Sequence, residues 1–91
     1  MEHDLDIDAR GLLCPLPVLR ARKALAAMGA GQVLRLRATD PAAAIDIPHF
    51  CATSGHRLIA TRSGAGAGAG AGTGAGAGTG DETHYYLRRG G

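Results

Sequence analysis

Residues 11–17 read GLLCPLP, and they place one cysteine, Cys14, directly before two prolines that are two residues apart. Four roles are open to such a cysteine: a packed core thiol, a metal ligand, half of a disulfide, or a reactive nucleophile. Cys14 lies immediately before a predicted helix, at its N-cap or N′ position. The partial positive charge of a helix N-terminus favours a thiolate over a thiol. We therefore expect Cys14 to be a modestly activated nucleophile.

The residues around Cys14 predict a rigid setting for this thiol. Pro15 and Pro17 each lack an N–H, so they remove amides from the sulfur's surroundings, but they fix their own backbone angles and restrict the residue before them. Arg10, four residues upstream, could approach the thiolate, whereas Asp8 would oppose it. We therefore predict Cys14 as the catalytic residue, with Pro15, Pro17 and Arg10 in support.

The second cysteine, Cys51, is expected to pack in the core beside Phe50. Its neighbours His49 and His56 suggest a metal site, but they form one loose arm without a second ligand pair at zinc-like spacing. We predict no metal and no cofactor. The pattern C-P-x-P has no local resolving cysteine, which argues against a dithiol exchanger. No histidine is placed as an obvious base, which argues against a Cys–His hydrolase. The sequence leaves a Cys14–Cys51 disulfide open.

A lone, rigid and exposed thiol suits a carrier that accepts a sulfane sulfur from one protein and passes it to another. Leu16, Leu19 and Lys23 lie off the predicted core face of the helix and could form a contact patch beside Cys14, although a solvated helix surface is the simpler interpretation. Two alternatives remain. One is a non-catalytic regulatory or protein-interaction module, and the weaker one is metal or redox sensing through both cysteines.

The elements that must hold Cys14 follow from the hydrophobic periodicity. Residues that alternate between polar and apolar predict strands at 4–9, 33–38, 56–62 and 83–89. A helix is predicted from Pro15 to Met28, with Pro15 at its first position, and its inward face is Val18, Ala21, Leu25 and Met28.

The second helix is less clearly defined. Asp40 can cap it, with Pro41 at its first position, but Pro48 would interrupt a regular helix. We expect either a kinked helix from 41 or a turn at 41–45 followed by a helix over about 47–54.

The element order β-α-β-α-β-β, in a chain of 91 residues, predicts a single domain over residues 1–91. We expect an α/β two-layer sandwich in which a four-stranded mixed sheet carries both helices on one face. Residues 64–80, GAGAGAGAGTGAGAGTG, are predicted to be a flexible hairpin insertion of low complexity. Every glycine in this block has an even number, so it cannot contain G-x-G-x-x-G, and no phosphate-binding loop follows.

The composition of the chain bears on three further classes of protein: nucleic-acid-binding, membrane-spanning and secreted proteins. A net charge of +2 without a long basic run gives no support for direct binding of nucleic acid. No stretch approaches the ~20 apolar residues of a membrane span. The segment MEHDLDIDAR lacks the apolar run of a signal peptide, so we expect a cytoplasmic protein with reduced cysteines.

The segment IDARGLLCPLPVLRARKAL resembles the N-terminal signature of the TusA/SirA family of small sulfur-carrier proteins, with its G-x-x-C-P-x-P core. DPAAAIDIPHFCATSGHRL is similar to the family's D-P-x-x-x-x-D-I-P-x-F-C segment, and the chain closes with YYLRRG. The resemblance covers residues 4–63 and 83–90. It implies the two-layer fold and a sulfurtransferase whose active cysteine, here Cys14, carries a persulfide, with Pro15 and Pro17 as its rigid scaffold.

The resemblance also implies partners. These are a cysteine desulfurase or a rhodanese-like protein as sulfur donor, and an acceptor protein that serves tRNA thiolation, sulfur oxidation or cofactor biosynthesis. Residues 64–80 depart from the family, which joins these strands by a short connection. Because closure entropy grows slowly with loop length, we expect the fold to survive this insertion.

Overall fold

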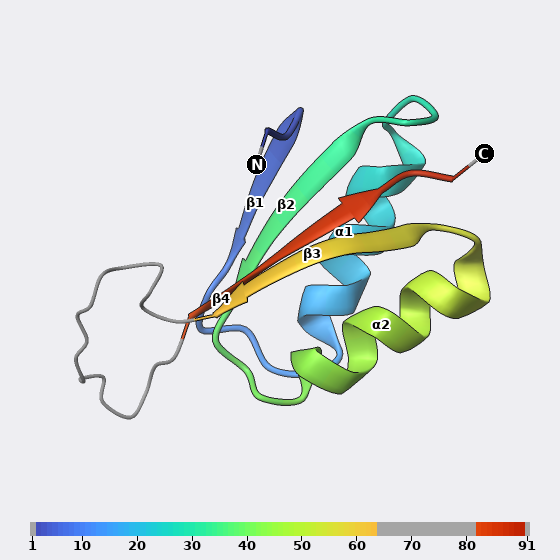
Figure 1. Ribbon diagram of the computed structural model, residues 1–91. Helices are drawn as coiled ribbons and strands as arrows, with labels where there is room; N and C mark the ends of the chain where they lie inside the picture. The colour runs from blue at the N-terminus through green and yellow to red at the C-terminus, as the bar shows by residue number, and fades with distance from the viewer. Residues whose placement is uncertain (1, 64–81, 91) are drawn as a thin grey trace.

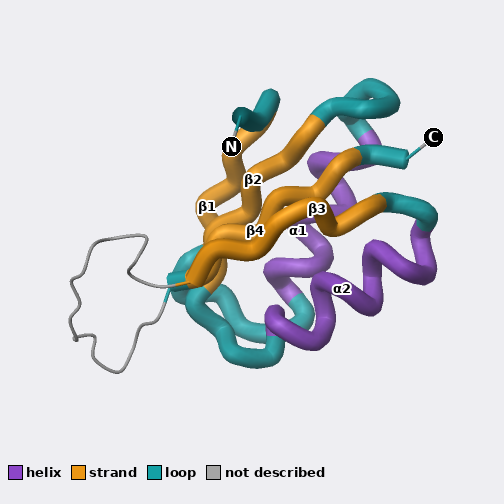
Figure 2. The backbone as a smooth tube through the Cα atoms, viewed as in Figure 1, coloured by secondary structure: helices purple, strands orange, loops and turns teal. Residues whose placement is uncertain are grey.

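The computed structural model, which describes residues 2–63 and 82–90, has a four-stranded sheet with both helices on one of its faces (Figures 1 and 2). The observed order is the predicted one, β-α-β-α-β-β. The elements are β1 (Leu5–Ala9), α1 (Leu16–Ala26), β2 (Val33–Ala38), α2 (Ala43–Ser54), β3 (Arg57–Ser63) and β4 (Thr83–Arg88). The predicted α/β two-layer fold is thus confirmed.

The strands lie in the order β1-β2-β4-β3, so the last strand of the chain enters the middle of the sheet. β1 pairs with β2 in parallel, and β4 runs antiparallel to both of its neighbours, which makes the sheet mixed. As a result the carboxyl ends of β1, β2 and β3 all lie at the same end of the sheet. The loops that lead to α1 and α2 leave from this end, which we call the site end. The other end of the sheet, where β2 begins and β4 ends, is called the opposite end.

The core lies between the sheet and the helices, and it follows the predicted periodicity. Leu34, Leu36 and Ala38 alternate inward along β2, while Ala21 and Leu25 form the centre of the inward face of α1. Val18 and Met28, at the two ends of that face, are partly buried against the core. Fully burying a leucine side chain contributes roughly 1.5–3 kcal/mol, so this apolar stripe is the main force that seats α1 on the sheet.

The helix boundaries differ from the sequence-based prediction at both prolines. α1 begins at Leu16, so Pro15 occupies the N-cap instead of the first helical position, and Pro17 follows inside the first turn and is buried. α2 continues through Pro48 as one helix, which favours the first of the two predicted alternatives. Pro48 has no N–H to donate to the carbonyl of Ala44. Both residues are exposed, so water can hydrate that carbonyl.

The predicted flexible insertion at 64–80 lies outside the described residues. Among the residues that are described, neither helix has the length and apolar character needed to cross a membrane.

Candidate functional site

Cys14 is exposed at the site end, on the loop between β1 and α1. Its backbone N–H donates a hydrogen bond of 2.6 Å to Oδ2 of Asp40, and the other oxygen of that carboxylate accepts the N–H of Ala42 at 3.1 Å. One carboxylate therefore joins the Cys14 loop to the turn that opens α2. The Leu16 N–H donates to the Leu13 carbonyl at 2.8 Å, which closes a turn around Cys14. The thiol is thus held on a loop with a defined backbone conformation.

The Cys14 thiol faces a carboxylate. Its Sγ donates a hydrogen bond to Oδ2 of Asp46, in the first turn of α2, over 2.9 Å. This hydrogen bond, followed by partial desolvation and by the charges of Asp46 and Asp40, holds the pKa of the Cys14 thiol above its usual range. The expected activation by the start of α1 is therefore outweighed. The first amide of that helix, from Leu16, is bound to a carbonyl and does not donate to the sulfur.

A shallow pocket of about 290 Å³ opens beside the thiol, between the start of α1 and one face of α2. It is lined by Cys14, Pro15, Val18, Asp46, His49, Phe50 and Thr53. The polar side chains of the lining besides the thiol are those of Asp46, His49 and Thr53. Asp46 and His49 are three residues apart on α2 and so lie on the same helix face. A pocket of this size accommodates a few atoms next to the sulfur.

Arg10 has other partners than the thiol. Its guanidinium donates to both carboxylate oxygens of Asp8, at 2.8 and 2.9 Å, and lies 3.5 Å from Glu82. The hydrogen bonds from Arg10 hold the pKa of Asp8 below its usual range, and the two ion pairs anchor Arg10 at the end of β1. Support of a thiolate by Arg10 thus stays a prediction, and the arginine would have to leave these partners to provide it.

The predicted contact patch is exposed. Leu16 and Leu19 are each nearly half exposed, and Lys23 lies on the same outward side of α1. Two further apolar side chains at the site end are even more exposed, namely Leu13 at 67% and Ile45 at 74%. Leu13 and Ile45 precede Cys14 and Asp46 in the chain, so apolar surface flanks both partners of the thiol hydrogen bond.

Cys51 is buried in the core and both cysteines are free, so the open alternative of a Cys14–Cys51 disulfide is not realised. Burial raises the pKa of the Cys51 thiol to about 11. The fold therefore supports the expectation that Cys51 is a packing residue of the core. Within residues 2–63 and 82–90, no group of three or more histidine, cysteine or acidic side chains is arranged to hold a metal ion.

Comparison with known proteins places this site in a family. A family model described as sulfurtransferase TusA matches residues 5–68, which include the Cys14 loop and α2. The chain belongs to the TusA family. The sulfur carrier protein TusA of Allochromatium vinosum is 46% identical over 61 residues, or 67% of this chain and 80% of that protein. The sulfur carrier protein TusA of Pseudomonas entomophila is 45% identical over 63 residues, which are 69% of this chain and 79% of that protein.

One solved structure supports the TusA-family fold. The crystal structure of a SirA-like protein from Desulfitobacterium hafniense superposes with a TM-score of 0.61, covering 92% of this chain and 96% of that one, at 24% sequence identity. At that identity the likeness concerns the fold alone.

Sequence reasoning missed three residues of the site. The sequence pattern assigns Asp40 only the role of a helix cap, and it gives neither Asp46 nor His49 a role beside Cys14. A signal was present, since the segment D-P-x-x-x-x-D-I-P-x-F-C that carried the resemblance contains both aspartates. What the sequence lacked was the distance across the fold, because Asp46 is 32 residues from Cys14.

Proposed function

We propose that this protein relays sulfur as a persulfide on Cys14, from a donor protein to an acceptor protein. Membership of the TusA family supports a role in sulfur transfer. The observation that carries the proposal is the geometry of Cys14, an exposed thiol on a hydrogen-bonded loop at the mouth of a small pocket. A shallow site fits a reaction in which the second reactant arrives attached to another protein.

The transfer is an exchange between sulfur atoms and needs no external oxidant. The Cys14 thiol loses its proton to solvent, and the thiolate attacks the terminal sulfur of a donor persulfide. The sulfur–sulfur bond of the donor breaks as the new bond to Cys14 forms, and the departing donor thiolate takes up a proton. A thiol and a persulfide enter, and a thiol and a persulfide leave. Delivery to the acceptor repeats the exchange in the other direction.

Asp46 gives this carrier a resting state. While its carboxylate accepts the thiol hydrogen bond, Cys14 stays protonated and weakly nucleophilic. A partner that brings a cation to Asp46 would withdraw this acceptor and release the thiolate at the moment of docking. We propose such pairing as the trigger for transfer.

Docking would use the exposed apolar residues at the site end, Leu13, Leu16, Leu19 and Ile45, with Lys23 at the rim. Exposed apolar residues that surround a reactive group are typical of protein interaction sites. The proposed donor is a cysteine desulfurase or a rhodanese-like protein, and the proposed acceptor serves tRNA thiolation, sulfur oxidation or cofactor biosynthesis.

The test is intact-mass measurement after incubation with a cysteine desulfurase and cysteine, without reductant. We expect the wild type to gain the mass of one sulfur atom, Cys14→Ser to gain none, and Cys51→Ala to load as the wild type does. If Cys14→Ser still gains sulfur, or if a panel of desulfurase and rhodanese-like donors loads none on the wild type, the proposal is wrong.

The docking surface is tested with the same assay. Leu16→Ser combined with Leu19→Ser should slow loading by a desulfurase without slowing alkylation of Cys14 by a small reagent. The matched control is Leu5→Ser, at an exposed leucine of the edge strand β1, which is 38% exposed. Equal loading rates in all three proteins would refute a role for the patch.

A further inference from the structure

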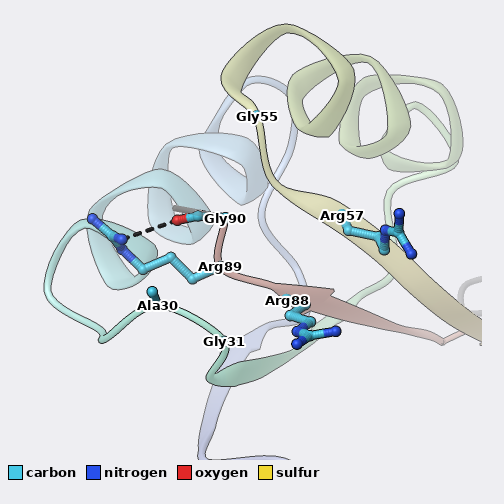
Figure 3. Close-up of a pocket in the computed structure, with 7 residues that line it drawn as sticks. All are labelled: Ala30, Gly31, Gly55, Arg57, Arg88, Arg89 and Gly90. Carbon is cyan, nitrogen blue, oxygen red and sulfur yellow. Dashed lines mark hydrogen bonds between the residues drawn. The ribbon is translucent and has the colours of Figure 1, made fainter.

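One feature that the sulfur relay does not use is a basic pocket of about 550 Å³ at the opposite end of the sheet from Cys14. It lies where β4 ends, β3 begins and the turn before β2 comes alongside (Figure 3). Its lining consists of arginines and of residues with little or no side chain: Ala30, Gly31, Gly55, Arg57, Arg88, Arg89 and Gly90. Three arginines line this pocket, and the lining that the described residues provide contains no acidic side chain.

Two of these arginines are placed opposite each other. Arg57 on β3 and Arg88 on β4 are direct partners in the antiparallel register, so their side chains leave the same face of the sheet. The preceding residue, Leu87, is fully buried toward the helices, so Arg88 lies on the open face. Figure 3 shows the two side chains extending from neighbouring strands. Like charges directly opposite each other destabilise a strand pair.

Elsewhere on the sheet face that the helices do not cover, two arginine side chains are paired with a carboxylate. Arg35 forms a two-pronged ion pair with Asp6, at 3.0 and 2.7 Å, and Arg37 lies 3.5 Å from the same carboxylate. Arg57 and Arg88 take part in none of the ion pairs of the described residues. Two charges are thus left facing each other without compensation within the described part of the chain.

The third arginine is structural. The Nε of Arg89 donates to the carbonyl of Leu25 in the last turn of α1, at 2.7 Å, and its Nη1 donates to the carbonyl of Gly90 at 3.0 Å. Its backbone bonds to Gln32 and Gly31, both at 2.9 Å. Arg89 is therefore fixed by its hydrogen bonds, and Figure 3 shows its side chain extending away from those of Arg57 and Arg88. The two guanidinium groups of Arg57 and Arg88 form no ion pair with the described residues.

The glycines keep the pocket open. Gly31 and Gly55 both have a positive φ, of +85° and +80°, and a Cβ built on either meets no atom within 4 Å. The two glycines form turns at the rim of the pocket, where the chain presents backbone atoms only. A bulky group attached to a bound anion would find space there.

We propose that this pocket binds a doubly charged oxyanion of the phosphate class, as free phosphate or as a phosphate monoester. Planar guanidinium groups on two strands can donate to different oxygens of one tetrahedral group. A dianion matches the two charges of Arg57 and Arg88, which no described residue compensates, whereas a single carboxylate matches only one. The lining that the described residues form contains no aromatic side chain on which a nucleobase could stack. We therefore expect the site to recognise the charged phosphate group and not a nucleobase.

This proposal is independent of the sulfur relay. Because the pocket and Cys14 lie at opposite ends of the sheet, an anion can be bound while Cys14 is engaged with a partner. The site is therefore a second binding function on the same small domain.

The test is an NMR titration of the ¹⁵N-labelled full chain with inorganic phosphate at constant ionic strength. We expect saturable shifts of the amide signals of Gly31, Gly55 and Gly90 and of the Nε signals of Arg57 and Arg88. In the double variant Arg57→Gln/Arg88→Gln the affinity should fall at least tenfold. This variant should stay folded, since it removes a repulsion. The matched control, Arg22→Gln/Arg62→Gln, removes two exposed arginines outside the pocket and should bind phosphate as the wild type does.

Further probes distinguish the sources. Tighter binding of O-phosphoserine or glycerol phosphate than of phosphate identifies an organic phosphate as the ligand, and equal affinities identify the free ion; both support the proposal. Shifts that do not saturate, or equal losses in the two double variants, overturn it. Tighter binding of a hexaglutamate peptide than of any phosphate also overturns it, in favour of an acidic protein segment.

Discussion

Removal of the Asp40 carboxylate should loosen the loop that carries Cys14. Asp40 accepts the amides of Cys14 and Ala42, and so connects the reactive loop to the start of α2. Each of these two hydrogen bonds contributes roughly 1 kcal/mol net at a half-exposed position. We expect Asp40→Ala to lower the free energy of unfolding by about 2 kcal/mol. Asp40→Asn, which keeps one oxygen acceptor, should lose about half of that.

Urea unfolding followed by circular dichroism measures this loss, which corresponds to a fall of roughly 10–15 °C in Tm for a domain of this size. The ¹⁵N spectrum of the folded variant adds a local measurement, because the Cys14 amide should lose the downfield shift of a short hydrogen bond to a carboxylate. Loading of sulfur should slow even under conditions where the variant is fully folded, since the loop then samples more conformations.

The matched control is Asp4→Ala. Asp4 accepts a single amide, that of Val33, at 2.8 Å and at the opposite end of the sheet. We expect this variant to lose about 1 kcal/mol or less and to load sulfur normally. Ordinary surface substitutions change the free energy of unfolding by up to roughly 0.5 kcal/mol. If Asp40→Ala differs from the wild type by no more than this, the assigned role of Asp40 is refuted. Equal effects of the two substitutions on loading would refute its local character.

Three further outcomes are expected. Asp46→Asn removes the carboxylate that raises the pKa of Cys14, so the pH–rate profile for alkylation by iodoacetamide should move to lower pH; an unchanged profile would contradict the resting-state proposal. In native protein at pH 8 only Cys14 should be alkylated, and Cys51, buried and with a pKa of about 11, should react only after denaturation, as peptide mass mapping can establish. Gly90→Ala would drive a Cβ into the carbonyl of Gly55, so it should destabilise the fold by roughly 1–3 kcal/mol in urea unfolding, and stability like that of the wild type would show that the chain end yields freely.

Local pattern predicts the order and type of the six elements of the described fold, and it leaves open only the extent of α2. Alternation along residues 33–38 predicts both the strand β2 and its inward face, because successive side chains of a strand point to opposite sides. The spacing of Ala21 and Leu25 predicts the buried face of α1 for the corresponding helical reason. Prolines were harder to read. The extent of α2 through Pro48 depends on whether the freed carbonyl can reach water, which is a property of the packed molecule.

By itself the sequence determined that Cys14 is a lone thiol on a proline-stiffened turn, and it pointed to a sulfur-carrier family. Only the tertiary structure decided the charge around that thiol. The helix start was expected to favour the thiolate, but folding brings Asp46 within 2.9 Å of Sγ from 32 residues away, and a direct hydrogen bond outweighs a partial dipole charge. In the same way, register alone sets Arg57 opposite Arg88. Periodicity depends on neighbours in the chain, whereas the electrostatics of a site depends on neighbours in space.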